Sequence, residues 1–303
     1  MTSQAASVPR AAGGRPAGDG RRRIFWALYL PPMIALLLLV VAPLALMAIF
    51  SFRPDLNGNL VGLFAPTLKQ YQGILGASVY LPLLGTSMVM AAIVAVVGTL
   101  LAYPVAYFLA FRAGRHAGTY LLLLLLPFWT SYLLRVMAWK LMLGEEGVIN
   151  SVLLSLGAIT EPLSALLYNK GAVVVTLIYV WIPFAALPIL AALQRIDPAL
   201  LDAASDLYAR PSEQLRRVVV PMSMPGIIAA FFLVFIPTVG EYVTPLLVGG
   251  TTGTMYGNVI QDFFTKAANW PFGSALSMVM LLITLVFAGL ALRVINVRRL
   301  LPT

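Results

Sequence analysis

The chain has 303 residues, of which 60% are hydrophobic and 10% are charged. Soluble domains carry about 25% charged residues, so this composition excludes a water-soluble enzyme and indicates a protein that crosses a membrane repeatedly. Cysteine is absent and histidine occurs once, at His116, which argues against disulfides and against thiolate or multi-histidine metal sites. The net charge of +9 is divided among short runs between apolar segments, unlike the clustered basic face of a nucleic-acid-binding protein.

Six apolar segments follow an N-terminal stretch of different composition. Residues 1–23 are rich in Gly, Ala, Ser and Arg, and we expect them to form a disordered cytoplasmic tail. A bilayer-spanning helix needs about 20 apolar residues, and the first segment is too long for a signal peptide. The sequence therefore predicts an all-α, polytopic membrane protein whose membrane domain covers residues 24–303. Its expected transmembrane helices are residues 24–50, 81–111, 119–143, 172–193, 226–248 and 273–292.

Basic residues between the spans predict their orientation. Most of the 20 lysines and arginines lie in the tail, after the second and fourth spans, and at the C-terminus. Cytoplasmic segments carry an excess of Lys and Arg, so both termini are expected in the cytoplasm. Residues 194–225 then form the longer of two internal loops.

This internal loop carries the signals of two short helices. Asp197 followed by Pro198 is a typical helix start, an N-cap side chain before proline at the first helical position. The chain is expected to break at residues 208–211, to form a second short helix from Ser212, and to end it at Pro221 and Pro225. The first helix has an apolar face made of Leu200, Leu201, Ala204 and Leu207.

Two short amphipathic helices on the cytoplasmic side favour a docking element for a partner protein. The alternative is an interfacial helix that lies on lipid, which Arg216 and Arg217 would favour. Both interpretations make the loop a contact surface.

The loop resembles the "EAA" loop of permease subunits of binding-protein-dependent ABC importers. That pattern reads Glu-Ala-Ala, a glycine four residues after the second alanine, then an apolar–proline step and a Pro-Gly pair. Here Asp202, Ala203 and Ala204 stand at the triplet, Pro221 at the apolar–proline step, and Pro225–Gly226 at the end.

Three positions depart from the family pattern. Asp202 replaces glutamate, which keeps the charge but shortens the reach of the side chain. Tyr208 occupies the glycine position, although a side chain disfavours the positive φ that glycine allows, and Arg210 stands where a small capping residue is common. The resemblance implies contact with an ATPase subunit through Asp202, Ala203, Ala204, Leu207, Tyr208, Arg210, Pro221 and Gly226.

Further blocks resemble the spermidine/putrescine-type branch of this family and extend over nearly the whole chain after the tail. They are residues 67–71, 103–107, 126–131 through Arg135 and Trp139, 235–237 with 240–242, and 269–271.

The resemblance implies a type I ABC importer permease in the bacterial inner membrane. Its partners would be a second permease subunit, two ATPase subunits, a periplasmic substrate-binding protein and membrane lipid, with no nucleic acid and no cofactor. The sequence contains no G-x-x-x-x-G-K-[ST] motif, so we expect ATP hydrolysis to reside in a separate subunit and this chain not to be an enzyme.

Two ionisable residues within the expected spans are candidates for the cargo path, because charge inside a bilayer needs an explanation. Glu241 could attract a cationic cargo, with Trp129, Tyr132 and Tyr242 as aromatic walls. Alternatively, Glu241 could form an ion pair with Arg135 that only holds helices together.

The sequence leaves alternatives for the cargo and for the class of transporter. In the polyamine-type pattern an acidic residue often follows the proline after Gly-Glu-aromatic, but here Pro245 precedes Leu246. An amino-acid-like or phosphonate cargo is therefore an alternative to a polyamine. A secondary transporter would leave the long internal loop unexplained, and a membrane-embedded enzyme would need a polar constellation that the sequence does not supply.

Overall fold

The computed structural model describes residues 18–54 and 66–295 of the chain. It divides into two units, Met1–Ile49 and Phe50–Thr303. The described part of the first unit consists of helix α1 (Gly18–Ser51), which continues into the start of the second and contains a membrane-length apolar stretch, Phe25–Ser51. This helix begins at Gly18 rather than at residue 24, and the rest of the expected tail lies outside the described residues.

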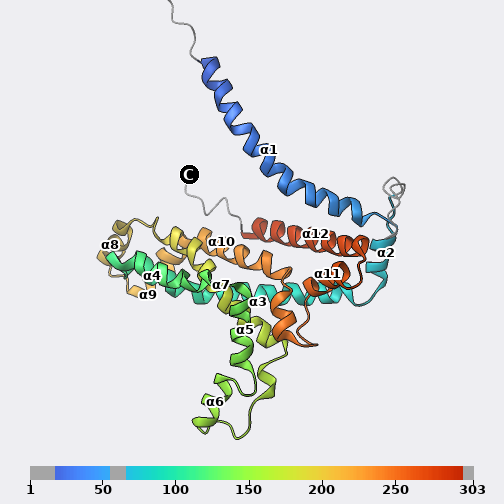
Figure 1. Cartoon of the computed structure of the whole chain (residues 1–303). Helices are drawn as coiled ribbons and strands as arrows, with labels where there is room; N and C mark the ends of the chain where they lie inside the picture. Colours follow the sequence, from blue (N-terminus) through green and yellow to red (C-terminus); the bar gives the residue numbers. More distant parts are fainter. Residues whose placement is uncertain (1–17, 55–65, 296–303) are drawn as a thin grey trace, which may run out of the picture. The chain divides into compact units, whose positions relative to one another are not determined.

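The second unit is all-α in its described residues, as the sequence predicted (Figure 1). Short 3-10 and π-helical segments, labelled η, alternate with α-helices. The elements are α2 (Lys69–Gly76), α3 (Tyr80–Phe111), η2 (Gly114–His116), α4 (Ala117–Leu125), η3 (Leu126–Trp129), α5 (Tyr132–Leu143), α6 (Val148–Ser155), η4 (Ser164–Leu166), α7 (Lys170–Leu193), α8 (Pro198–Asp206), α9 (Pro211–Gln214), η5 (Leu215–Val219), α10 (Val220–Val239), η6 (Pro245–Gly249), α11 (Tyr256–Thr265) and α12 (Trp270–Ile295).

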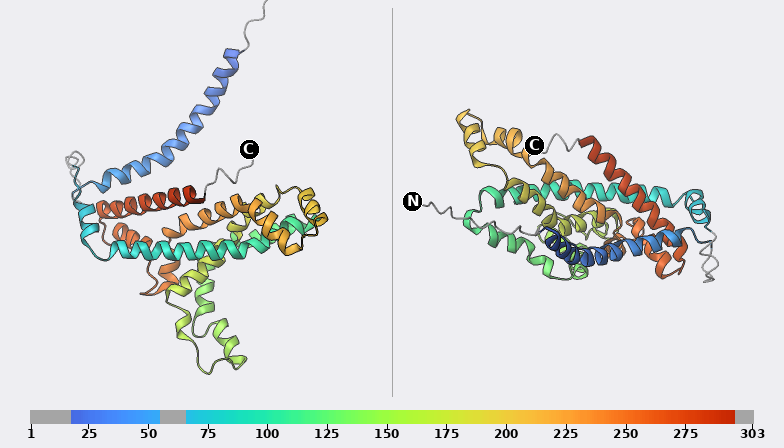
Figure 2. Two further views of the ribbon diagram at one scale, coloured as in Figure 1. Left: turned by 180° about the vertical axis from the view of Figure 1, so that it is seen from behind. Right: turned by 90° about the horizontal axis from the view of Figure 1, so that it is seen from above.

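The core of this unit lies where α3, α7 and α10 pack against one another (Figures 1 and 2). Small and branched side chains fill it, among them Ala95, Ile189 and Val234, which are fully buried. At Gly226 a Cβ atom would lie 2.5 Å from the Cβ atom of Ala192, so α10 approaches α7 closely only because this residue has no side chain. In a lipid environment such close packing of small residues supplies the attraction between helices.

Two of the six expected spans are not the continuous helices that apolar length predicted. The third span is broken: the helical stretches Gly114–Trp129 and Tyr132–Ser155 meet at an angle of 86°. Pro127 lies in the last turn before the break, and Thr130 and Ser131 are extended. As a result α5 and α6 project from the layer of long helices (Figures 1 and 2).

The fifth span differs from its predicted range at both ends. It was expected at residues 226–248, but the helical stretch runs from Pro211 to Val239 and stops at Gly240. Pro221 and Pro225 do not end the helix. The π-helical turn η5 precedes Pro221, and there the Val220 N–H donates to the Leu215 carbonyl. The helix thus passes through residue 225, where the coupling loop was expected to end.

Candidate functional site

The first candidate site is the loop that joins α7 to α10, and its start follows the sequence prediction. Asp197 is the N-cap of α8, where its Oδ1 atom accepts a hydrogen bond of 2.9 Å from the Ala199 N–H, and Pro198 takes the first helical position. The residues of the expected apolar face differ in how far they are buried. Leu201 packs against the buried core, whereas 82% of Leu207 is exposed.

The turn after α8 is a Schellman motif. The Ala209 N–H donates to the Ala204 carbonyl at 3.0 Å, and the Tyr208 N–H donates to the Ser205 carbonyl at 2.9 Å. Tyr208 occupies the left-handed position of this motif, with φ of +61°. An L residue there is less stable than glycine by about 1–2 kcal/mol, so the departure from the family pattern places strain at this turn.

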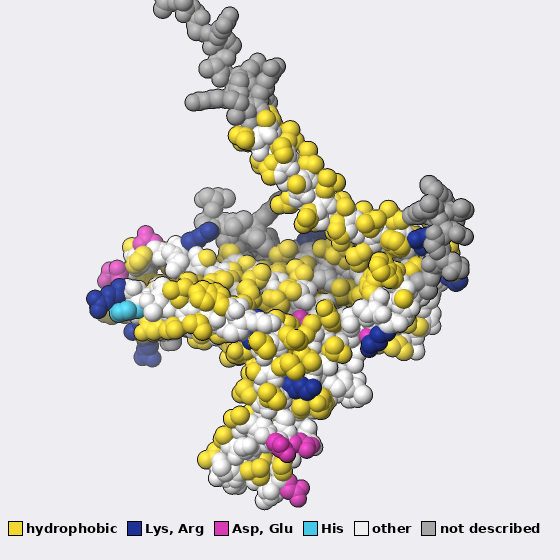
Figure 3. All heavy atoms as spheres, viewed as in Figure 1, with side chains coloured by type: hydrophobic (Ala, Val, Ile, Leu, Met, Phe, Trp, Pro, Cys, Tyr) yellow, Lys and Arg dark blue, Asp and Glu magenta, His cyan; other side chains and the backbone are white. Residues whose placement is uncertain are grey.

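A second short helix follows directly. The Glu213 carboxylate accepts a hydrogen bond of 3.0 Å from the Arg210 N–H, so Arg210 acts through its backbone at the start of α9. The Gln214 amide donates to the Ser205 hydroxyl at 2.9 Å and to the Ala209 carbonyl at 3.1 Å, which ties the two short helices together. Charged side chains gather at this end of the second unit (Figure 3).

Of the other residues assigned to this loop, Asp202 and Ala203 are exposed on α8. Pro221 and Gly226 lie instead inside α10, where Gly226 serves the contact with α7. The structure thus places these two residues in α10 and not in the turn.

The second candidate site is the break after α10, at residues 240–242. Glu241 lies beyond the helix end, and its carboxylate accepts hydrogen bonds from the backbone N–H groups of Val243, at 2.9 Å, and Thr244, at 3.2 Å. The side chain therefore caps the helical stretch that restarts there. An acidic cap is favourable at a helix N-terminus because the exposed N–H groups carry partial positive charge.

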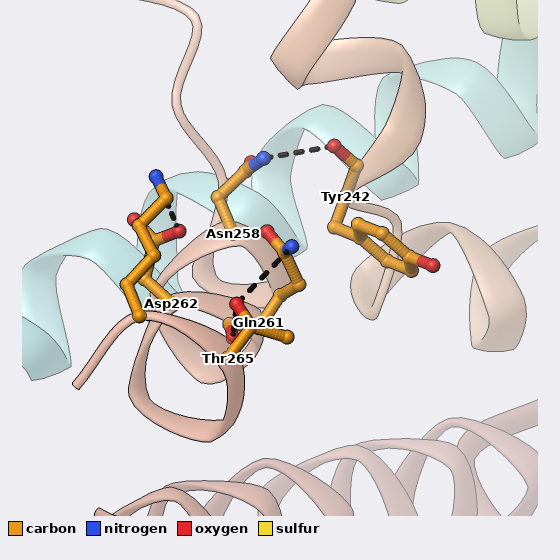
Figure 4. Close-up of polar contacts among 6 residues, drawn as sticks. Tyr242, Asn258, Gln261, Asp262 and Thr265 are labelled. Atoms are coloured by element: carbon orange, nitrogen blue, oxygen red, sulfur yellow. Dashed lines mark hydrogen bonds and ion pairs between the residues drawn. The ribbon is translucent and has the colours of Figure 1, made fainter. Parts of the chain in front are cut away.

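Residues distant in sequence hold this break in place. The Asn258 amide donates to the Tyr242 carbonyl at 2.8 Å and its Oδ1 atom accepts from the Met255 N–H at 3.0 Å (Figure 4). At Gly257 a Cβ atom would lie 2.5 Å from the Gly240 carbonyl oxygen and 2.7 Å from that of Glu241. Backbone that leaves a helix at membrane depth needs such partners, since lipid offers none.

The two breaks meet through Tyr132. Its hydroxyl lies 2.6 Å from the hydroxyl of Thr244, which is fully buried, and it lies within electrostatic range of both Glu241 and Arg135. The structure brings together three residues that the sequence singled out, Tyr132, Arg135 and Glu241. It adds three residues that the sequence analysis did not name: Thr244, Gly257 and Asn258. Nothing in the sequence marked these three, because their role depends on contacts across the fold.

Arg135 has a different partner from the one considered in the sequence. No ion pair joins it to Glu241 in the described structure; its guanidinium lies 4.5 Å from the centre of the Phe128 ring and 5.8 Å from that of Tyr132. Its Nε atom is buried without an acceptor among the described residues. The interpretation of Arg135 and Glu241 as a direct structural pair is therefore wrong.

The two remaining aromatic candidates are accessible. Tyr242 exposes 42% of its surface at the break, and its ring points away from Asn258 (Figure 4). Trp129 exposes 83% and makes no ring contact with another described aromatic residue. Arg135 also lines a cavity of about 380 Å³, together with Thr130, Leu134, Ala138, Trp139, Met142 and Tyr179.

Comparison with known proteins defines the class of this fold. Residues 14–301 match the family described as binding-protein-dependent transport system inner membrane component. The chain belongs to this family, which confirms the resemblance seen in the loop. It is a permease of the ABC importer kind and not itself an enzyme.

Two curated relatives and one solved structure illustrate the likeness. The spermidine/putrescine transport system permease protein PotB of Haemophilus influenzae is 34% identical, over 80% of this chain and 84% of its own length. PotB of Escherichia coli K12 is 36% identical, over 72% of this chain and 78% of its own length. A chain of a bacterial alginate ABC transporter, crystallised with its alginate-bound periplasmic protein, shares the fold with a TM-score of 0.72 and 15% identity, covering 92% of this chain and 96% of that one.

Proposed function

We propose that this chain forms half of the membrane path of an ATP-driven importer, with α8, the Tyr208 turn and α9 as its contact with an ATPase subunit. The observation that carries the proposal is the continuous helical stretch from Pro211 to Val239. Its 29 residues, about 44 Å at 1.5 Å per residue, connect the exposed turn directly to the break at Glu241. Movement of the turn therefore moves the path.

The proposed assembly contains a second permease subunit, two ATPase subunits and a periplasmic binding protein, in the inner membrane with both termini in the cytoplasm. Family membership and the exposed turn support it. The break at Glu241, with Tyr132, Tyr242 and Arg135 around it, is the proposed cargo path, and Trp129 is proposed to line its approach.

Spermidine and putrescine are the first candidate cargoes. Two relatives named for these compounds are 34–36% identical to the chain, and Glu241 with two tyrosines offers a carboxylate and aromatic faces to an ammonium group. An amino-acid-like or phosphonate cargo is the second candidate, favoured by the unsatisfied buried Nε atom of Arg135 and by Leu246 in place of an acid. Uptake of labelled compounds of each class by the complete importer decides between them.

Replacement of Leu207 by arginine tests the coupling role. Because this side chain is 82% exposed, the substitution should leave folding and insertion intact while it places a charge in the proposed apolar contact. We expect ATP hydrolysis stimulated by the binding protein, and transport, to fall by about tenfold or more. Ala204→Arg should act in the same direction.

Leu156→Arg is the matched control, since Leu156 is 75% exposed at the end of α6 and lies far along the chain from the loop. It should leave stimulated ATP hydrolysis unchanged. Full transport by both Leu207→Arg and Ala204→Arg would show that the loop does not couple ATP hydrolysis to transport.

A further inference from the structure

The tyrosine at the tip of the proposed ATPase contact is held in a backbone conformation that its side chain disfavours. With φ of +61°, Tyr208 occupies the position of the Schellman turn at which glycine is most favourable. The hydrogen bonds of the turn are made by backbone groups alone, so they would form equally well with glycine. The turn itself therefore does not explain a tyrosine.

Contacts within the chain do not explain it either. Tyr208 exposes 95% of its surface, and its ring packs on no other aromatic side chain in the described structure. Tyr168, which also has a positive φ of 60°, differs in this respect. The Tyr168 side chain is 55% exposed, and its ring lies 5.7 Å from the Lys140 ammonium. A Cβ atom added at Gly250 would lie 2.8 Å from the Tyr168 Cβ atom, so the two residues approach closely. Strain without an internal contact that offsets it points to a contact outside the chain.

We infer that Leu207 and Tyr208 form a two-residue knob at the tip of the loop, and that the Tyr208 ring is an anchor that this permease adds to its contact with the ATPase subunit by filling an apolar pocket there. The inference rests on the proposed function of the loop. Leu207, adjacent to Tyr208, is 82% exposed, so the tip presents an aliphatic and an aromatic side chain together. Buried aromatic anchors of this kind dominate the binding energy of protein interfaces.

A protein pocket suits this knob better than a lipid surface. α8 carries Asp202 and Asp206, both exposed, and Asp197 is exposed at its start. Anionic headgroups of the cytoplasmic leaflet attract basic segments and repel such a cluster of acids. Of the basic side chains, Arg210 is exposed two residues after Tyr208, and Arg216 and Arg217 lie further along, in η5.

Tyr208→Gly distinguishes a role of the tyrosine in the turn from a role of its ring in binding the ATPase. The substitution relieves the backbone strain, so the turn should gain stability, but it also removes the ring. The test uses the full-length chain assembled in nanodiscs with its second permease and ATPase. We expect retention of the ATPase and stimulated ATP hydrolysis to fall by about tenfold, while amide hydrogen exchange in α8 stays as slow as before or becomes slower. Tyr208→Phe should behave like the unchanged chain. Normal ATPase retention by Tyr208→Gly would overturn the inference.

Two control variants are needed to interpret the result for Tyr208→Gly. Tyr168→Gly makes the same substitution at a positive φ outside the loop, and it should leave ATPase retention unchanged. Leu207→Arg tests the proposed function by itself. If neither Leu207→Arg nor Tyr208→Gly affects the ATPase, the coupling role fails; if only Leu207→Arg does, the loop couples but the tyrosine knob is wrong.

The absence of cysteine from the chain allows a direct test of what covers the tip. A single cysteine in Tyr208→Cys should react with a soluble maleimide in inside-out vesicles stripped of ATPase, and it should be protected by about tenfold or more when the ATPase is added back. Tyr168→Cys should show no such protection. Protection of Tyr208→Cys in the stripped vesicles would indicate burial in lipid and would exclude the knob.

Discussion

At the scale of single residues, Glu241 has a structural role that the hydrogen bonds show and a transport role that we propose. One of its oxygens accepts two backbone N–H groups, so the side chain completes the start of the next helical stretch. A carboxylate has about four acceptor positions. The two backbone N–H groups use two of them, and the Tyr132 hydroxyl is also within hydrogen-bonding range, so acceptor capacity remains for a cationic group.

Glu241→Gln should distinguish these two tasks. The amide oxygen can still accept both backbone hydrogen bonds, and no ion pair with Arg135 is broken, so assembly and basal ATP hydrolysis should be nearly unchanged. If the charge attracts a cationic cargo, uptake of that cargo should fall by about tenfold or more, since charge-assisted contacts contribute about 1.5–3 kcal/mol. Uptake of the radiolabelled cargo by the reconstituted importer measures this fall.

Glu241→Ala is the comparison variant for this prediction. It removes the cap as well as the charge, and loss of a cap lowers stability by about 1 kcal/mol. We therefore expect it to lower both the thermal stability of the detergent-solubilised chain and its transport. Normal uptake by Glu241→Gln would remove Glu241 from the cargo path and leave it the capping role alone.

At the scale of elements, the break after α10 is determined by α11. Gly257 lets the first turn of α11 lie directly against the carbonyl oxygens of Gly240 and Glu241, and Asn258 in the same turn binds the Tyr242 carbonyl. Two adjacent residues of one helix thus position three consecutive residues of the break. A change in α11 is therefore expected to alter the path without touching it.

Gly257→Ala should disrupt the break. The added methyl would lie 2.5 Å from a backbone oxygen, which cannot move aside as a flexible side chain can. Overpacking of this kind destabilises by about 1–3 kcal/mol, so we expect a lower midpoint of thermal unfolding and a loss of uptake. Gly289→Ala in α12 is the matched control, because a Cβ atom there meets no atom within 4 Å. If the two variants behave alike, the close approach of α11 does not determine the break.

Sequence patterns predicted some elements closely and others poorly for identifiable reasons. The apolar spans at α3 and α7 match the expected ranges to within two residues, and Asp197 with Pro198 marks the start of α8 as expected. The breaks at Thr130–Ser131 and at Gly240–Tyr242 were missed, because long apolar stretches lie on both sides of each break. Their polar partners are distant: the Tyr132–Thr244 contact joins residues 112 positions apart.

The candidate site shows the same division. A proposed Arg135–Glu241 pair followed from equal depth in two straight helices, and the breaks invalidate that geometry. The resemblance in the loop gave Tyr208 its place at the turn, and the Schellman hydrogen bonds are consistent with that placement. A short-range motif can be read from sequence because neighbouring residues complete it, whereas the break depends on residues of α5 and α11 that are distant in sequence.

At the scale of the whole second unit, one helical stretch connects the two candidate sites. The stretch Pro211–Val239 starts in the loop with α9 and ends at the break, and it passes α7 at the close contact of Gly226 with Ala192 and Pro188. A stiff helix that tilts about such a contact moves both ends together. This connection gives a physical route by which an event at the loop can open or close the path.

We propose that the loop and the α5–α6 projection lie on opposite sides of the membrane, and the lack of cysteine makes this testable. Single cysteines in Arg115→Cys, Arg210→Cys and Glu146→Cys replace exposed residues of the α3–α4 connection, the loop and the projection. In intact cells an impermeant maleimide should label only Glu146→Cys, because basic residues concentrate in the segments that contain Arg115 and Arg210. Permeabilised cells should label all three, which controls for burial. External labelling of Arg210→Cys would contradict the orientation and the ATPase contact together.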